Sequence, residues 1–342
     1  MFNPIRTKRL LIRPFKADDL EPFLARRNDP QVAEYQNWTL PFPRERAEKI
    51  VSELMGVEGP QVDEWWMATI ADPKTDEPLG DLALHLTWEG HTAEVGYTLA
   101  HQYWGQGYAT EALDPLVDYL FQELNVTRAF GMLHPANRAS AMVLERCGFL
   151  FEGHTRLSFW LGDEVSDDHI YGMIRSDWEA WRSRPRTAAE EVRLVSVTTD
   201  IESLVFKLRT HKTQEAFVAP MAASFADALF PEIFNGAPLV PWMRAIEADG
   251  DIVGFLMVAL TTEHHPEPFL WRLLIDRFHQ RRGIATRALG LLEEELRKMG
   301  DKTLLVSWEE GKGSPRPFYL ARGFETTGEI VDEETEARKQ IA

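Results

Sequence analysis

The chain has 342 residues, of which 44% are hydrophobic, and a formal net charge of −17 at pH 7. This length suits two domains of common size, and the excess of acid disfavours broad surfaces for nucleic acid or anionic membranes and favours cationic substrates. The only cysteine, Cys147, excludes an intrachain disulfide and a cysteine-based zinc site. The longest apolar run, IVGFLMVAL, is too short to cross a bilayer, and the N-terminus lacks a continuous apolar leader. We therefore expect a cytoplasmic protein without a membrane or nucleic-acid partner.

The first informative stretch joins a strand to a helix. AEVGYTL, residues 93–99, is rich in aromatic and branched side chains and predicts a β-strand. WGQGYATEAL, residues 104–113, follows it and opens a stripe of apolar residues at helical spacing that runs to Leu124. Two glycines and two alanines therefore stand where a helix begins.

The first half of the chain closes with a second block and a polar join. HPANRASAMVLERCGF, residues 134–149, predicts a helix that ends before GF, with Asn137 and Ser140 placed to cap its start. A polar stretch around Pro185 then separates a Trp-rich end from the strand-like run VRLVSV. We place the two domains at residues 1–184 and 190–342.

The second half repeats the landmarks of the first. FLWRLLI predicts a strand, QRRGIATRAL (280–289) places Gly283 176 residues after Gly107, and RGF repeats CGF with Gly323 175 residues after Gly148. Two short motifs that keep their separation across half the chain indicate a duplicated domain rather than a solenoid repeat.

Each helix entrance favours the binding of phosphate. The first N–H groups of a helix lack intrahelical partners and carry the positive end of the helix dipole, and glycine lets an anion approach them. Close packing on a sheet would also explain small residues here. Neither copy has the lysine of a P-loop, and neither has the glycine spacing of a dinucleotide-binding fingerprint.

These motifs resemble those of one known superfamily. QRRGIA fits the [QR]xxGx[GA] pyrophosphate loop of the GNAT acyl-CoA N-acyltransferases, and WGQGYA is similar to the variant with Trp first. Together with TKRLLIRPFKADDL, the block HPANRASAMVLERCGF resembles ribosomal-protein-alanine-type GNATs over about residues 5–180. FVAPMAASFADALF and FYLARGFETTGEI resemble the bacterial diamine and spermidine N-acetyltransferases over about 191–335.

The resemblance implies a fold and a co-substrate. The fold is α/β (α+β), with two tandem GNAT domains that each have a mixed, mostly antiparallel sheet and flanking helices. Two central strands of each sheet part like a V, and the pantetheine of acetyl-CoA fills the gap. The residues that the resemblance assigns to acetyl-CoA are Trp104, Gly105, Gln106, Gly107, Tyr108, Ala109, Thr110, Asn137, Ser140, Leu273, Ile275, Gln280, Arg281, Arg282, Gly283, Ile284, Ala285 and Thr286. Arg281 and Arg282 would charge the second loop, whereas Gln106 brings no charge to the first.

Catalysis requires a base for the acceptor ammonium and an acid for the leaving thiolate. Glu94, on the strand before the first loop, is the candidate base, although a surface strand residue would look the same. Tyr319 matches the family's tyrosine in the helix before GF and is the candidate acid. Ser140 is a further candidate catalytic residue, in the first copy. A backbone N–H at a bulge near Leu273 or Tyr97 could stabilise the oxyanion.

The two copies depart from each other at these positions. Leu144 stands in the first copy where Tyr319 would align, and Leu270 stands in the second where Glu94 would align. The base of the second copy therefore stays open among the candidates Glu263, Glu267, Asp276, Glu333 and Glu334.

Three classes of function fit the sequence. The first is an acetyl-CoA-dependent N-acetyltransferase that acts on a small cationic amine, such as a polyamine or an amino-sugar antibiotic, or on a peptide N-terminus. The second keeps one domain as a non-catalytic acyl-CoA-binding or structural module, and the third is a CoA-independent interaction protein. His134, His264 and His265 lack companions at metal-ligand spacing, so we expect no metal. The oligomeric state stays open.

Overall fold

The structure, a computed structural model, describes residues 2–342. The chain divides into two compact units, Met1–Arg182 and Ser183–Ala342, which we call domain 1 and domain 2. Within the described range, no helix is both long and apolar enough to pass through a bilayer.

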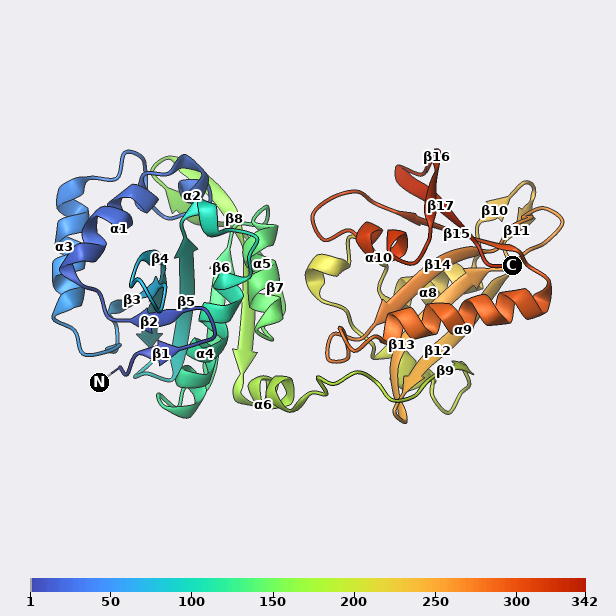
Figure 1. The fold of residues 1–342 in the computed structure, drawn as a ribbon, viewed down its shortest axis with the longest axis horizontal. Coiled ribbons are helices and arrows are strands. Elements are labelled where there is room, and N and C mark those ends of the chain that lie inside the picture. Colours follow the sequence, from blue (N-terminus) through green and yellow to red (C-terminus); the bar gives the residue numbers. More distant parts are fainter. Residues whose placement is uncertain (1) are drawn as a thin grey trace. The chain divides into compact units, whose positions relative to one another are not determined.

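Domain 1 contains an eight-stranded sheet in the order β1-β2-β3-β4-β5-β6-β8-β7 (Figure 1). Its elements, with α6 extending one residue into domain 2, are β1 (Ile5–Arg6), β2 (Leu11–Arg13), η1 (Ala17–Asp19), α1 (Leu20–Arg27), α2 (Pro30–Ala33), α3 (Arg44–Met55), β3 (Trp65–Ala71), β4 (Pro78–Thr87), β5 (Thr92–Leu99), η2 (His101–Tyr103), α4 (Tyr108–Gln122), β6 (Arg128–Leu133), α5 (Arg138–Arg146), β7 (Leu150–Leu161), β8 (Glu164–Ile174) and α6 (Arg175–Ser183).

Domain 2 contains a seven-stranded sheet in the order β16-β17-β15-β14-β13-β12-β9, and a separate small hairpin (Figure 1). Its elements are β9 (Val192–Ser196), α7 (Glu202–Phe206), η3 (Lys212–Gln214), α8 (Met221–Leu229), β10 (Ile233–Phe234), β11 (Ala237–Pro238), β12 (Pro241–Ala248), β13 (Asp251–Ala259), β14 (Phe269–Ile275), α9 (Ile284–Met299), β15 (Thr303–Trp308), α10 (Arg316–Leu320), β16 (Glu325–Val331) and β17 (Glu334–Gln340).

The duplicated fold and the parted central strands are confirmed. In domain 1, β5 and β6 pair in parallel only from Thr92 to Glu94 on the β5 side. In domain 2, the parallel pair β14 and β15 share the single register pair Phe269 and Leu305. The other paired strands of the two large sheets run antiparallel within residues 2–342. Beyond these short contacts the structure gives no further pairing between the two central strands of either sheet within residues 2–342, and the loops that lead to α4 and α9 follow β5 and β14 in the chain (Figure 1).

Helices cover both faces of each sheet. In domain 1, α1 covers the face that carries Asp81 and Thr98, because Arg26 and Arg27 of α1 bond to Asp81 and Arg27 also reaches Thr98. We call this the α1 face. In domain 2, α7 and α8 pack with β12, β13 and β14 in one hydrophobic cluster. The helix α9 packs in a second hydrophobic cluster, which we call the α9 cluster. We call these the α8 face and the α9 face.

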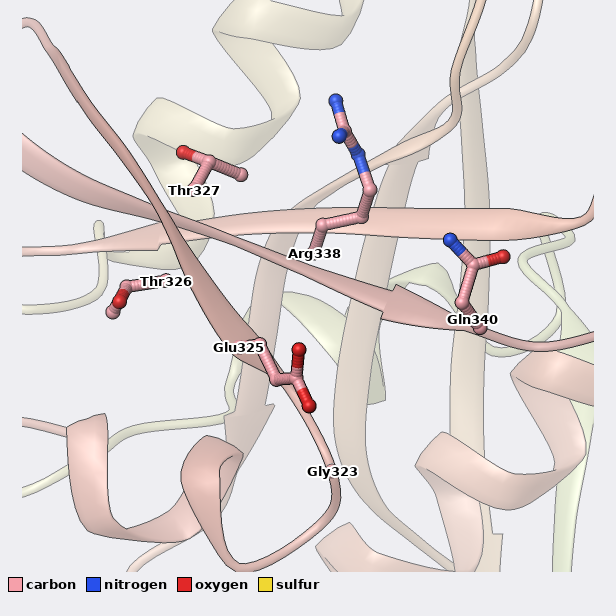
Figure 2. Close-up of a pocket in the computed structure, with 6 residues that line it drawn as sticks. All are labelled: Gly323, Glu325, Thr326, Thr327, Arg338 and Gln340. Atoms are coloured by element: carbon pink, nitrogen blue, oxygen red, sulfur yellow. The ribbon is translucent and has the colours of Figure 1, made fainter.

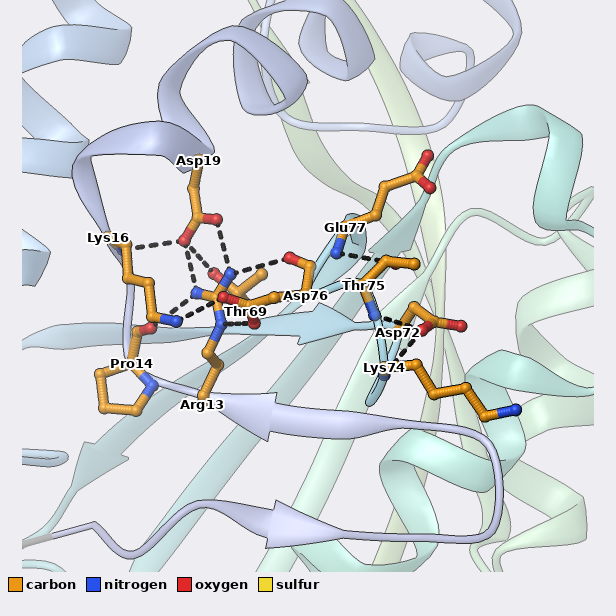
Figure 3. Close-up of polar contacts among 10 residues, drawn as sticks. All are labelled: Arg13, Pro14, Lys16, Asp19, Thr69, Asp72, Lys74, Thr75, Asp76 and Glu77. Carbon is orange, nitrogen blue, oxygen red and sulfur yellow. Dashed lines mark hydrogen bonds and ion pairs between the residues drawn. The ribbon is translucent and has the colours of Figure 1, made fainter.

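A buried ion pair fixes the start of domain 1. The Arg13 guanidinium makes two hydrogen bonds to the Asp19 carboxylate, of 2.8 and 2.9 Å, and also bonds to Asp76 at 2.6 Å (Figure 3). Thr69 donates to the same Asp19 carboxylate at 2.8 Å. Burial alone would raise the pKa of Asp19, but hydrogen bonds from Arg13, Lys16 and Thr69 outweigh burial and hold the pKa below its ordinary value.

We expect Asp19→Ala to destabilise domain 1 by about 3–5 kcal/mol, because the Arg13 charge would stay buried without its main partner. Asp72→Ala, which removes a partly exposed carboxylate that caps the neighbouring turn, should cost about 1 kcal/mol or less. Denaturant unfolding measures both. Because the pKa of Asp19 is lowered in the folded state, its contribution should be complete above about pH 4 and be lost as pH falls through the folded pKa. Equal stability of the two variants would contradict this assignment.

Candidate functional site

The helix entrance of domain 1 is open, as the sequence predicts. Gly107 is the N-cap of α4 with φ of 81°, and Gly105 has φ of 73°, where an added Cβ would meet no heavy atom within 4 Å. The Trp104 indole N–H donates to the Leu99 carbonyl at 2.9 Å, which anchors the loop to the end of β5. Ala109 is partly buried against the core, which keeps the first turn close to the sheet.

A cation at this entrance was missed in the sequence. Arg9 donates to the Gln106 carbonyl at 3.0 Å, pairs with Glu111 in the first turn of α4 at 2.6 Å, and stacks over the Tyr108 ring. Gln106 itself brings no charge to the first loop, but Arg9 places a guanidinium beside it. Arg9 is distant from the loop in sequence and reaches it only through the packing of the β1–β2 hairpin, so no local motif points to it.

The entrance of domain 2 has the same backbone geometry. Gly283 is the N-cap of α9 with φ of 75°, and a Cβ at this position would meet no heavy atom within 4 Å. Arg281 is exposed and has no ion pair within residues 2–342. Ala285 and Thr286 continue into the first turn, and Thr286 accepts hydrogen bonds from Arg322. A phosphate fits such an entrance, because the first backbone N–H groups are free of intrahelical partners.

Arg282 is not placed to charge this loop. Its side chain is buried, pairs with Asp249 at 2.6 Å, and donates to the Thr187 carbonyl at 2.9 Å. The expectation that both arginines face the phosphate is therefore wrong for Arg282. The Arg282 guanidinium binds the Asp249 carboxylate and the Thr187 carbonyl at the same time. It therefore attaches the segment before β9 to the rest of domain 2.

Several other predicted contact residues are engaged inside the fold. The Gln280 amide bonds to Gln214 and to the Ile275 carbonyl. Ile284 is buried in the α9 cluster, against which Leu273 and Ile275 pack. In domain 1, the Thr110 hydroxyl is buried without a hydrogen-bond partner within residues 2–342.

Glu94 lies in a polar row on the α1 face of domain 1. The register places Trp65, His85 and Glu94 side by side across β3, β4 and β5. The Trp65 and His85 rings stack, with centroids 5.0 Å apart. Burial raises the pKa of Glu94 above its ordinary value, the charge of Asp168 raises it further, and His85 opposes both. A carboxylate with a raised pKa is a stronger base than an ordinary one, a property that suits a proton acceptor.

The predicted bulge is absent at Tyr97 and present near Leu273. Tyr97 pairs regularly with Leu82, and β4 and β5 have no register shift. In domain 2 the shift falls at Trp271, because Met257 pairs with Arg272 while Val258 pairs with Leu270. The bulge therefore lies two residues before Leu273.

The bulge also changes which residues correspond between the domains. Glu94 marks the point where β5 and β6 part, and Phe269 marks the same point in β14. Phe269, rather than Leu270, therefore stands where Glu94 stands, and Leu270 is buried in the α9 cluster. The row equivalent to Trp65, His85 and Glu94 is apolar in domain 2, and its members are Pro241, Ala259 and Phe269.

A hydroxyl pair bridges β5 and α5 in domain 1. Asn137 caps α5 by accepting from the Ser140 N–H at 3.1 Å. The Tyr97 hydroxyl lies 2.8 Å from both the Ser140 carbonyl and the Ser140 hydroxyl. Burial raises the pKa of Tyr97, so the phenol stays protonated and can donate. Sequence reasoning missed the hydrogen bonds of this phenol to Ser140, which spacing along one strand does not reveal.

Tyr319 is the corresponding phenol of domain 2 but comes from α10. Its ring is buried and stacks on Trp308 at 5.9 Å, and Phe324 packs against its edge. Its hydroxyl makes no hydrogen bond to any residue that the structure describes. Burial raises the pKa of Tyr319, and the nearby Glu334 raises it further. Leu144 is buried at the matching position of domain 1.

A polar pocket of about 340 Å³ lies elsewhere, on the β16–β17 hairpin of domain 2 (Figure 2). Its lining residues are Gly323, Glu325, Thr326, Thr327, Arg338 and Gln340. None of the predicted acetyl-CoA or catalytic residues lines it. No cluster of three or more potential metal ligands occurs in residues 2–342.

Comparison with known families accounts for both helix entrances. A model described as an acetyltransferase (GNAT) domain matches residues 9–150, and one described as the acetyltransferase (GNAT) family matches residues 207–324. Both halves of the chain belong to the GNAT acetyltransferase family. The chain is therefore an acetyl-CoA-dependent N-acetyltransferase with tandem GNAT domains.

The matches to the relatives described next each cover about half of this chain or less. An uncharacterized N-acetyltransferase of Bacillus licheniformis is 27% identical over 175 residues, which cover 50% of this chain and 96% of that protein. The ribosomal-protein-serine acetyltransferase of Escherichia coli is 30% identical over 102 residues, 30% of this chain and 57% of that protein. A GNAT-family acetyltransferase structure from Bacillus anthracis has 26% identity and a TM-score of 0.47, and covers 51% of this chain and 99% of its own.

Proposed function

We propose that the two GNAT domains acetylate different primary amines. In domain 2 the acceptor is a small polyamine-like amine, and Tyr319 protonates the leaving thiolate. In domain 1 the acceptor is a peptide N-terminus or an amino sugar, and Glu94 accepts its proton while Ser140 and Tyr97 supply hydroxyls on the opposite side of the parted strands.

One observation carries the difference between the domains. The same row of the same fold holds Trp65, His85 and Glu94 in domain 1 and only apolar side chains in domain 2. The row in domain 1 contains side chains that can accept the proton of the acceptor amine, and the row in domain 2 contains none. The net charge of −17 supports cationic acceptors, because it raises their concentration near the protein.

The relatives support the choice of acceptors. The E. coli relative is named for a ribosomal protein, which favours a peptide amine as one acceptor. The motifs of the second half resemble the diamine and spermidine enzymes, which favours a polyamine as the other. An alternative is that one domain binds acetyl-CoA without catalysis and supports the other.

A screen for CoA release tests the proposal. The wild type, Gly107→Glu and Gly283→Glu would be assayed with spermidine, an aminoglycoside and an alanine-initiated peptide. We expect Gly107→Glu to lose one acceptor and Gly283→Glu to lose another. Loss of every activity through only one of the two variants would instead favour the non-catalytic module.

In the Gly283→Glu background, Glu94→Gln should lower kcat of domain 1 by roughly 10² to 10⁴, because a positioned base is lost. Since the pKa of Glu94 is raised, the wild-type rate should fall with decreasing pH at a pH above the usual carboxylate range, and the variant should lose this acid limb. Glu89→Gln, in the exposed β4–β5 turn, serves as the control. An unchanged pH profile in Glu94→Gln would exclude Glu94 as the base.

A further inference from the structure

The final strand of each domain in chain order, β8 in domain 1 and β17 in domain 2, carries a carboxylate at the same position. Phe130 of β6 pairs with Gly172 of β8, and the equivalent Leu305 of β15 pairs with Arg338 of β17. Four residues before these partners, where the last strands pass beside the gap, stand Asp168 and Glu334. The two residues are therefore structural counterparts, although no motif in the sequence connects them.

Asp168 shares a sheet face with Glu94 in domain 1, and Glu334 shares a sheet face with Phe269 in domain 2. Because side chains alternate along a strand, Asp168 shares the α1 face with Glu94, and its charge acts on Glu94. In the same way Glu334 shares the α8 face with Phe269, and Tyr319 packs with Trp308 in the α9 cluster. Glu334 and Tyr319 thus lie on opposite sides of the sheet and close enough for the Glu334 charge to act on the phenol.

Each carboxylate is held by a serine hydroxyl. Ser158 of β7 donates to Asp168 at 2.8 Å, and Ser307 of β15 donates to Glu334. Asp168 is buried, and Glu334 is partly buried. A serine donor fixes the orientation of a carboxylate and leaves its other oxygen positions for a further donor, such as an ammonium group.

The other acids proposed for domain 2 have different surroundings. Glu267 bonds to Thr303 and pairs with Arg338. Asp276 accepts the backbone N–H groups of Arg209 and Phe278, which stabilises a turn. Glu263 and Glu333 are exposed in connecting segments. Of the five candidates, Glu334 is the one beside the parted strands and near Tyr319.

We propose that Asp168 and Glu334 bind the ammonium group of the acceptor amine at the parted strands, and that Glu334 is also the base of domain 2. This inference rests on the proposed function. In domain 2 the ammonium transfers a proton to the Glu334 carboxylate, and the neutral nitrogen bonds to the acetyl carbonyl carbon. The carbon–sulfur bond then breaks, and the thiolate takes the Tyr319 proton. The nitrogen loses its second proton to solvent as the amide forms, and solvent returns a proton to the Tyr319 phenolate and removes the one that Glu334 accepted. In domain 1 Asp168 orients the ammonium and Glu94 accepts the proton.

The test uses the full chain with Gly107→Glu, so that transfer comes from domain 2, and spermidine as the amine. Glu334→Gln should lower kcat/KM by roughly 10² to 10⁴ and leave the acetyl-CoA Kd unchanged. By calorimetry without acetyl-CoA, the same variant should bind spermidine roughly tenfold more weakly or worse, because it loses a charge-assisted hydrogen bond. Glu334→Asp should restore part of the rate, because it keeps a carboxylate at this position.

Glu333→Gln is the matched control, since it removes the same charge from the neighbouring exposed position. Equal transfer or equal spermidine affinity in Glu334→Gln and Glu333→Gln would overturn the assignment. If the wild type binds acetyl-CoA but transfers nothing to spermidine, the proposed acceptor fails, and calorimetry alone decides the inference. A wild type that binds no spermidine would overturn both.

Discussion

Gly283→Glu is expected to weaken acetyl-CoA binding by domain 2 by roughly 100-fold or more, because like-charge juxtaposition costs several kcal/mol. Gly283 begins α9 with φ of 75°, and the space beside it is open. A glutamate would fill the space where the pyrophosphate approaches and would place a negative charge at the positive end of the helix dipole. The arginine Arg281 next to it could also pair with the new carboxylate.

Calorimetry measures the effect of Gly283→Glu as the loss of one acetyl-CoA site. The control variant is Gly290→Glu. Gly290 lies inside the same helix with open space around it, so the variant adds the same charge about two turns from the entrance. We expect it to bind acetyl-CoA like the wild type. Circular dichroism and thermal unfolding would show that both variants remain folded. Wild-type affinity in folded Gly283→Glu would place the pyrophosphate elsewhere.

The features that the sequence predicted are local ones. The helix entrances at Gly107 and Gly283 follow from glycine at a helix start and an apolar stripe at helical spacing, and both signals lie within about fifteen residues. The strands before them are short runs of aromatic and branched residues. The duplication is visible because it preserves the distance between these local signals.

The features that the sequence missed depend on contacts between distant residues. Arg9 reaches the first loop through the packing of a hairpin, and Arg282 turns away from the second because it pairs with Asp249. The extra residue at Trp271 shifts the alignment by one, so an ungapped comparison paired Glu94 with Leu270 instead of Phe269. Glu334 could be separated from the other acids only once its strand was placed beside the gap.

Tyr319→Phe should lower the turnover of domain 2 by roughly 10² to 10⁴, because the thiolate would leave without a proton donor. Burial, and then the charge of Glu334, raise the pKa of Tyr319 above its ordinary value and favour the protonated phenol. The wild-type rate should therefore lack a basic limb from this group. Measurement requires the Gly107→Glu background and conditions in which chemistry limits the rate.

The stability of Tyr319→Phe separates catalysis from packing. The hydroxyl makes no hydrogen bond within residues 2–342, and the ring contacts with Trp308 and Phe324 persist in phenylalanine. Removing a hydroxyl that stabilises the fold through a hydrogen bond costs about 1 kcal/mol, so this variant should unfold at nearly the wild-type denaturant concentration and bind acetyl-CoA equally well. A large fall in rate with unchanged stability and affinity assigns the phenol to the reaction. Unchanged turnover, or a loss of rate matched by a loss of stability, would show that Tyr319 serves only to pack the core.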